Sequence, residues 1–160
     1  MADIKIKPGI NQFFINEAMG LLLWCCALLF SGYDGVVYGV SISTCSLYLL
    51  LIFSLVLGYK FWYLSTIRWT ITAEQIVYTR GIFTREKDFI ELYRVYDFNE
   101  VQTFIQRLLS VKTVVVISTD NTHPTLNMVG VNNCIDISDI IRERVETVKK
   151  TKKIYEVANN

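Results

Sequence analysis

The run LYLLLIF, residues 47–53, is an unbroken series of aliphatic and aromatic residues, and the chain around it carries almost no charge. Between Lys7 and Lys60 there is no Lys or Arg, and the acids in that interval are Glu17 and Asp34. A helix needs about 20 mostly apolar residues to cross the hydrocarbon core of a membrane. We therefore expect a transmembrane helix over residues 36–58.

A second apolar stretch, residues 13–30, precedes it and contains the run GLLLWCCALLF. The connecting sequence SGYDG, residues 31–35, is rich in the residues that form tight turns. Together they predict a helical hairpin that crosses a membrane twice. A buried hairpin of a soluble protein is disfavoured because neither stretch shows a charged face at helical spacing. A cleaved signal peptide is disfavoured because the first stretch lacks a small-x-small cleavage site and an equally apolar stretch follows.

The basic residues around the hairpin predict its orientation. Lys5 and Lys7 precede the first stretch, Arg68 follows the second, and the loop between them has no Lys or Arg. Cytoplasmic flanks are the ones that carry Lys and Arg, so we expect a multi-pass protein of the cytoplasmic (inner) membrane with both termini cytoplasmic. Aromatic rings at headgroup depth beside a snorkelling lysine are typical of an interfacial anchor, which we assign to Lys60, Phe61, Trp62 and Tyr63.

The composition excludes several classes of protein. Hydrophobic residues make up 52% of the 160 residues, which excludes a disordered chain, and a net charge of +1 argues against a nucleic-acid partner. The one histidine is His123, and the four cysteines form no C-x-x-C pair, so we expect no metal and no cofactor. No nucleophile motif or glycine-rich phosphate loop is present, so we expect no catalytic residues and no enzyme activity.

The residues after Arg68 read as short strands separated by turn signals. The VVVI run, residues 114–117, is apolar on both faces and predicts a central strand, whereas Phe104, Ile105, Leu108 and Leu109 have helical spacing. The predicted strands are residues 69–72, 75–80, 86–93, 95–101, 111–118 and 125–131.

The end of the chain predicts an amphipathic helix. Asp136 is a good N-cap, Asp139 suits the positive end of the helix dipole, and Lys149 and Lys150 suit its negative end. One apolar stripe is formed by Ile137, Ile140, Ile141, Val145 and Val148. We expect this stripe to cover an antiparallel sheet or to close one end of a small open barrel.

Three stretches of the second half are similar to a known family: ELYRVYDF at residues 91–98, QTFIQRLL at 102–109 and TVVVIST at 113–119. With WTIT at 69–72 and GIFTR at 81–85, they resemble the bacterial pleckstrin-homology-like (PH-like) domain, in particular that of YdbS-like membrane proteins, which carry two transmembrane helices ahead of one such domain. The resemblance covers residues 67–148. It departs at Ser110, where the family usually has Gly, which concerns the turn geometry at that position.

The resemblance implies an α+β membrane protein. We expect a transmembrane helical hairpin over residues 1–66, a PH-like small β-barrel with a C-terminal amphipathic helix over residues 67–150, and a polar tail over residues 151–160. A fold of this kind does not by itself define a function.

Three functions remain open at this point. The first is a membrane-anchored module for protein interaction or scaffolding, with a protein partner or further copies of the chain. The second is an anionic-lipid binder or sensor, since membrane lipids are the expected neighbours, and the third is an accessory subunit of a transport or envelope-maintenance complex. The candidate lipid-surface contacts are Arg80, Phe83, Arg85, Lys87, Lys149 and Lys150.

Overall fold

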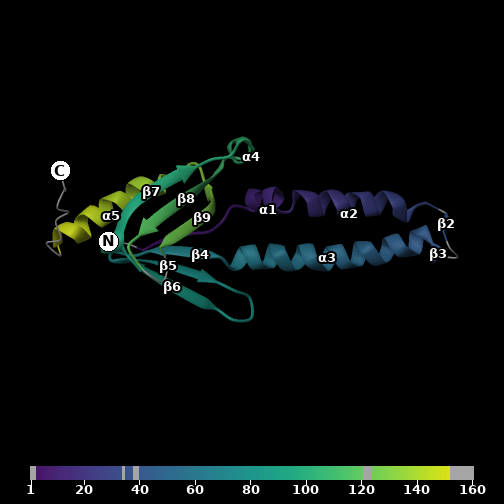
Figure 1. Cartoon of the computed structure of the whole chain (residues 1–160), viewed down its shortest axis with the longest axis horizontal. Coiled ribbons are helices and arrows are strands. Elements are labelled where there is room, and N and C mark those ends of the chain that lie inside the picture. Colours follow the sequence, from purple (N-terminus) through teal and green to yellow (C-terminus); the bar gives the residue numbers. More distant parts are fainter. Residues whose placement is uncertain (1–2, 34, 38–39, 121–123, 152–160) are drawn as a thin grey trace. The chain divides into compact units, whose positions relative to one another are not determined.

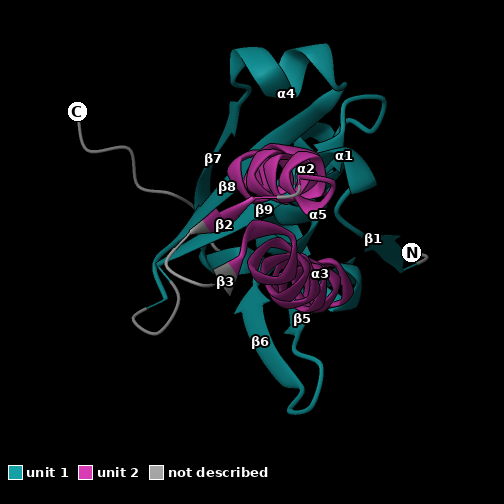
Figure 2. Ribbon diagram, turned by 90° about the vertical axis from the view of Figure 1, so that its right-hand side faces the viewer, with its two compact units in different colours: residues 1–12, 65–160 teal, residues 13–64 magenta. Residues whose placement is uncertain are grey.

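The computed structural model describes residues 3–33, 35–37, 40–120 and 124–151. It forms two compact units, unit 1 with Met1–Gln12 and Ser65–Asn160, and unit 2 with Phe13–Leu64 (Figure 2). Residues 1–12, which the sequence analysis assigned to the hairpin, thus belong with the β-rich part. Asp34 of the expected turn, His123 and residues 152–160 of the expected tail lie outside the described residues.

Unit 2 consists mainly of apolar helices. Helices α1 (Ile10–Asn16) and α2 (Ala18–Ser31) are bent by 73° at Glu17, and α3 spans Ile42–Thr66. By length and composition α3 is able to cross a membrane, and α1 with α2 would supply a second span if the bent pair counts as one. Trp24 Nε1 donates to Ser54 Oγ (2.9 Å) and Lys60 Nζ lies 2.6 Å from Glu17 Oε2, so α2 and α3 run side by side.

The second helix begins and ends later than the expected residues 36–58. Strands β2 (Val36–Val37) and β3 (Val40–Ser41) pair in a small ladder where the helix was expected to begin. β-Branched valines beside glycines favour this extended turn over helix. The helix also continues through Gly58, because one glycine costs only about 1 kcal/mol in a helix and the following residues remain apolar.

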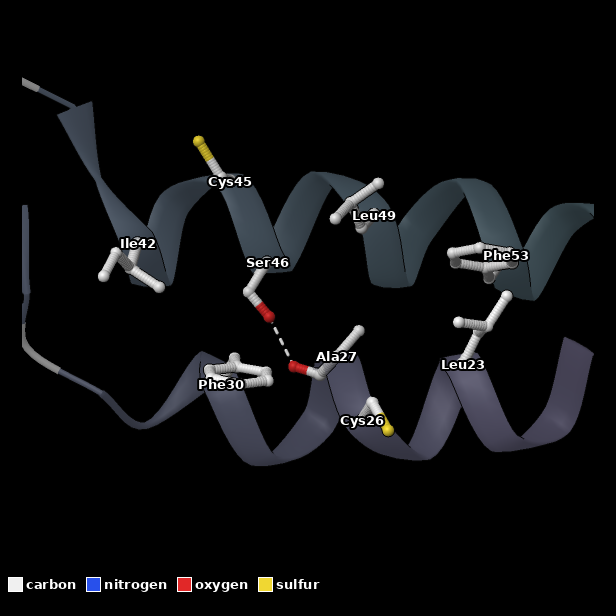
Figure 3. Close-up of a pocket in the computed structure, with 9 residues that line it drawn as sticks. All are labelled: Leu23, Cys26, Ala27, Phe30, Ile42, Cys45, Ser46, Leu49 and Phe53. Carbon is white, nitrogen blue, oxygen red and sulfur yellow. Dashed lines mark hydrogen bonds between the residues drawn. The ribbon is translucent and has the colours of Figure 1, made fainter. Parts of the chain in front are cut away.

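Figure 3 shows the groove between α2 and α3, with a volume of about 300 Å³. Ser46 Oγ donates to the main-chain oxygen of Ala27, which places a polar contact between two otherwise apolar helices. Cys26 and Cys45 point away from one another, and both are free thiols. The groove surface is otherwise formed by apolar side chains, among them Leu23, Phe30, Leu49 and Phe53.

Unit 1 contains two antiparallel sheets and a C-terminal helix (Figure 1). The first sheet has the order β1-β4-β5-β6, formed by Ile4–Ile6, Arg68–Ile71, Gln75–Arg80 and Glu86–Glu91. The second has the order β7-β8-β9, formed by Val95–Val101, Val111–Ser118 and Thr125–Asn132, so β8 is central, as predicted. Short helices η1 (Leu92–Arg94) and α4 (Phe104–Leu108) precede and follow β7, and α5 spans Ile137–Thr151.

The expected barrel is wrong in one respect: the two sheets are not closed into a barrel. After β6 the chain turns through η1, where Leu92 is fully buried, and β7 begins a separate sheet. A backbone hydrogen bond from Gly9 N to Gly130 O (2.7 Å) joins the segment after β1 to β9, without a strand ladder there.

The core lies between the two sheets and α5. Helix α5 packs against η1 and β7, and its buried stripe lacks Ile140, which is half-buried. Arg144 takes a buried place on the same helix and donates to the main-chain oxygens of Ile71 (2.6 Å) and Thr72 (2.8 Å). The fully buried side chains include Ile71, Ile76, Ile90, Leu92, Val114, Val116, Met128, Val131, Ile137 and Ile141.

Candidate functional site

The chain leaves unit 1 for the apolar helices, and returns from them, at one end of the first sheet. Strands β1 and β4 are antiparallel, with Ile6 opposite Trp69 and Ile4 opposite Ile71. The last residue of β1 and the first residues of β4 therefore lie at the same end. We call this the junction end, and the opposite end of unit 1 the distal end.

The β5–β6 turn lies at the junction end. Arg68, the first residue of β4, is opposite Thr79, and Arg80 is opposite Glu86, so residues 81–85 extend past the start of β4. Gly81 has a φ of +105°, and a Cβ there would lie 1.9 Å from Thr84 O, which explains why the turn begins with glycine. Phe83 at its tip is 86% exposed.

Helix α4 is also held at the junction end. The first residues of α1, which belong to unit 1, contact α4 directly: Asn11 Nδ2 donates to Leu109 O (2.8 Å), and Gln106 Nε2 donates to Gln12 Oε1 (3.1 Å). Gly130 of β9 has a φ of +79°, and a Cβ there would lie 2.6 Å from Gln12 Cβ. The absence of a side chain at Gly130 allows Gln12 of α1 to pack closely against β9, beside α4.

On α4 the buried side chain is polar and the exposed large side chains are apolar, which is the reverse of the arrangement on an ordinary surface helix. Its buried residue is Gln106, which also donates to Thr113 Oγ1 (2.9 Å) and closes a capping box with Thr103. Its exposed side chains are apolar: Phe104 is 82% exposed, Ile105 54% and Leu108 75%. Residues three and four apart are neighbours on a helix, and Leu108 is four residues after Phe104 and three after Ile105, so the three side chains form one surface, which we call the α4 patch.

The structure divides the predicted lipid-contact set between the two ends of unit 1. Arg80, Phe83, Arg85 and Lys87 surround the β5–β6 turn at the junction end. Helix α5 begins beside Lys112, whose Nζ lies 3.8 Å from Asp136, the residue before the helix. Farther along α5, Arg144 contacts Ile71 at the end of β4. Its last turn, with Lys149 and Lys150, therefore lies at the distal end, and Figure 1 shows α5 ending far from the β5–β6 turn.

Arg80 is held by carboxylates of its own hairpin. Its Nε donates to Glu86 Oε2 (2.8 Å), Nη2 lies 3.8 Å from Asp88 Oδ2, and the guanidinium lies over the Tyr78 ring at 5.5 Å. The hydrogen bond to Glu86 raises the pKa of Arg80 further above its ordinary value. Arg80 is thus neutralised locally, whereas Arg85 and Lys87 are exposed.

The predicted interfacial anchor lies within α3 rather than after it. Lys60 pairs with Glu17, and the Phe61 ring meets the Phe13 ring edge to face with centroids 5.3 Å apart. Trp62 is 59% exposed and Tyr63 37%. The positions agree with an aromatic belt near one end of the helix, and the depth of these residues in a membrane stays a prediction.

A model of the bacterial PH domain matches residues 18–145. This chain belongs to the bacterial PH domain family. The matched region of the bacterial PH domain protein includes α2 and α3 as well as β4–β9, and no catalytic family matches. The searches of curated proteins and of solved structures returned no match.

Unit 1, which we call the bacterial PH unit, has among its candidate contact features the α4 patch and a cleft lined by β5, β6 and β9. Among the described residues, no group of three or more His, Cys, Asp and Glu side chains could hold a metal ion. A cleft of about 230 Å³ between β5, β6 and β9 contains Arg80 and Asp88, which already contact one another, and Asn127.

The sequence analysis missed the α4 patch as a site. It recognised the helical spacing of Phe104, Ile105 and Leu108 but did not state which way they face. Thr103 and Gln106 have the spacing of a capping box, in which the glutamine accepts from Thr103 N, but the contacts that place Gln106 on the inner side, to Thr113 and Gln12, come from distant parts of the chain. With that glutamine on the inner side, the neighbouring apolar residues are directed outward.

Proposed function

We propose that this chain is a non-enzymatic, membrane-anchored interaction or scaffolding module, in which the apolar helices anchor the bacterial PH unit at the cytoplasmic face of the cytoplasmic membrane. The observation that carries the proposal is the α4 patch. Contiguous apolar surface of this kind on a folded unit marks a contact with a protein or a membrane. In the native membrane, a protein or the membrane itself covers this patch.

The strand pairing of unit 1 supports an even number of membrane crossings. Because Ile6 is opposite Trp69, both ends of the segment Phe13–Leu64 must lie on the same side of any bilayer that the segment enters. The basic residues Lys7 and Arg68 are at those ends, and such residues favour the cytoplasmic side. A hairpin with both termini cytoplasmic satisfies both conditions.

Exposure of the α4 patch in native membranes tests this proposal. In a full-length chain with its four cysteines replaced by alanine, a single cysteine is introduced by Leu108→Cys, or at the control position by Glu146→Cys on the outer face of α5. Each variant is treated with a water-soluble maleimide in opened native membranes. We expect position 108 to react several-fold more slowly than position 146, because the patch is covered. Equal rates at both positions would contradict the proposed function.

A separate binding site for anionic headgroups is less well supported as the primary function. Convergent, available cations are needed for headgroup recognition. Arg80 is engaged by Glu86 and Asp88, and Lys149 and Lys150 lie at the other end of the unit. The turn residues and the two lysines of α5 therefore stay candidates for separate, loose contacts with an anionic surface.

A further inference from the structure

We infer that the α4 patch is a lipid-inserting surface, and that with Phe83 it seats the bacterial PH unit on the same membrane that holds its hairpin. This inference rests on the proposed function and names what covers the patch. The occupant is the interfacial layer of the bilayer, contacted by apolar side chains rather than by a headgroup pocket.

The first argument is position. The first residues of α1 are hydrogen-bonded to α4 and to the residue that follows it: Gln12 accepts from Gln106, and Asn11 donates to Leu109 O. The returning chain enters β4 at Arg68, beside the β5–β6 turn. Both connections are a few residues long, so a bilayer that holds the helices lies close to the junction end, and the short tether keeps the local concentration of lipid high.

The second argument is that two separate apolar points lie at this end. Phe83 on the β5–β6 turn and Phe104 on α4 are each more than four-fifths exposed. In Figure 1 and Figure 2 the β5–β6 turn and α4 lie on opposite sides of the bacterial PH unit while both extend from the junction end. Insertion at both Phe83 and Phe104 would fix the orientation of the bacterial PH unit on the membrane, whereas insertion at one of them would leave the unit free to tilt.

The third argument is charge complementarity. Exposed cationic residues are placed around both apolar points: Arg107 is on α4, and Lys7 and Arg68 are at the two chain connections. Arg85 and Lys87 flank Phe83. Basic side chains around aromatic residues are the pattern of membrane-interface contacts, and each cation near an anionic surface strengthens the attraction to it. Three of these five, Lys7, Arg68 and Arg107, were not among the residues predicted to contact lipid.

A protein-free reconstitution tests the inference. The full chain carrying Leu108→Cys in the cysteine-free background is labelled with an environment-sensitive fluorophore and placed in vesicles of zwitterionic and anionic phospholipid. Phospholipids that carry a spin label at a shallow position serve as quenchers. We expect quenching several-fold stronger at position 108 than at the matched control position 146, with emission shifted to shorter wavelength.

A second variant separates insertion from proximity. Phe83→Ser combined with Phe104→Ser removes two exposed rings without touching the core, and it should restore water accessibility at position 108. The matched control, Phe89→Ser, removes a half-exposed ring from β6 and should leave the quenching unchanged. Equal quenching at positions 108 and 146, or unchanged quenching after the double substitution, would overturn the inference.

The two proposals can fail separately. If position 108 is protected in native membranes but open to water in protein-free vesicles, another protein or a second copy of the chain covers the patch. The interaction module then stands and lipid insertion is wrong. If position 108 reacts freely in native membranes, the proposed function itself is wrong.

Discussion

At the scale of single residues, Ser110 is held in a backbone conformation that suits glycine. Its φ is +54°, and it lies between α4 and β8, where its amide donates to Arg107 O and its carbonyl accepts from Asn133 N. The position at which the sequence departs from its family pattern is therefore a left-handed turn. That conformation costs a residue with a Cβ about 1 kcal/mol relative to glycine.

We predict that Ser110→Gly raises the free energy of unfolding of unit 1 by about 1 kcal/mol, because it removes this cost. The measurement is urea unfolding of the full chain in detergent, with Trp24 and Trp62 replaced by Phe so that buried Trp69 is the reporter. Ser110→Ala keeps the Cβ and should bring no gain. An equal gain in both variants would show that the hydroxyl, not the backbone, limits stability.

Arg144 is the residue whose burial is least expected from the amphipathic pattern. Its guanidinium caps the end of β4 by donating to the oxygens of Ile71 and Thr72. We predict that Arg144→Ala lowers the free energy of unfolding by about 2–3 kcal/mol, because a buried acceptor, Ile71 O, and a partly buried one, Thr72 O, lose a charged donor. Glu143→Ala, at an exposed position of the same helix, should change it by less than about 0.5 kcal/mol. The same fluorescence assay compares them, and similar losses would show that α5 is sensitive to any alanine.

At the scale of elements, an ionic cluster joins β7, β8 and α5. Lys112 Nζ lies 2.9 Å from Glu100 Oε1 and 3.8 Å from Asp136 Oδ1, and Ser138 Oγ donates to Glu100. Burial opposes ionisation of Glu100, but hydrogen bonds from Ser138 and Lys112 and the charge of Lys112 outweigh it and lower its pKa. The ionised carboxylate is therefore the form that the fold favours.

We predict a corresponding acid dependence. The stabilisation from Glu100 is fully present above the unfolded pKa of about 4.3 and is lost as the pH falls through the lower folded pKa. The difference in unfolding free energy between the wild type and Glu100→Gln should therefore shrink as the pH is lowered from about 6 to 3. Urea titrations across this range measure it. A difference that grows on acidification would contradict the assignment.

Strand β1 joins the N-terminal segment to unit 1 by pairing with β4, although the match to the bacterial PH domain begins only at residue 18. Ile6 is 3% exposed and packs in the core beside Trp69, whereas Lys5 is exposed. We predict that Ile6→Ala costs about 2–4 kcal/mol, as for other buried truncations, and speeds amide exchange in β4. Lys5→Ala on the same strand is the control. Hydrogen exchange of the full chain in detergent measures both, and unchanged β4 protection would mean that β1 is dispensable.

The elements show where the sequence was informative. Strands β4–β9 and α5 were predicted within a few residues, because alternating β-branched residues, turn residues and one apolar stripe are local signals. Strand β1 was missed because Ile4-Lys5-Ile6 is too short to signal a strand, and its partner lies about sixty residues away. The outward face of α4 and the open sheets depend on contacts between distant segments, which no local pattern reports.

At the scale of the whole molecule, we predict a topology with both termini cytoplasmic. A reporter fused after residue 160 should behave as cytoplasmic, and one inserted at Tyr33 as external, because the basic residues flank the outer ends of the hairpin. Paired reporter fusions in cells measure both positions. The reverse pattern would invert the orientation, and like behaviour of both reporters would exclude a double crossing.

The pairing of β1 with β4 also orders events during synthesis. Residues 4–6 leave the ribosome first, but their partner strand is made only after the whole apolar segment has emerged. The first sheet can therefore be completed only after that segment has turned back and returned the chain to the starting side. A chain whose second helix fails to insert would keep β1 and β4 apart, leaving an unpaired strand edge of the kind that invites aggregation or degradation. In the topology we predict, this sheet would therefore be completed only in chains whose apolar segment has inserted as a hairpin.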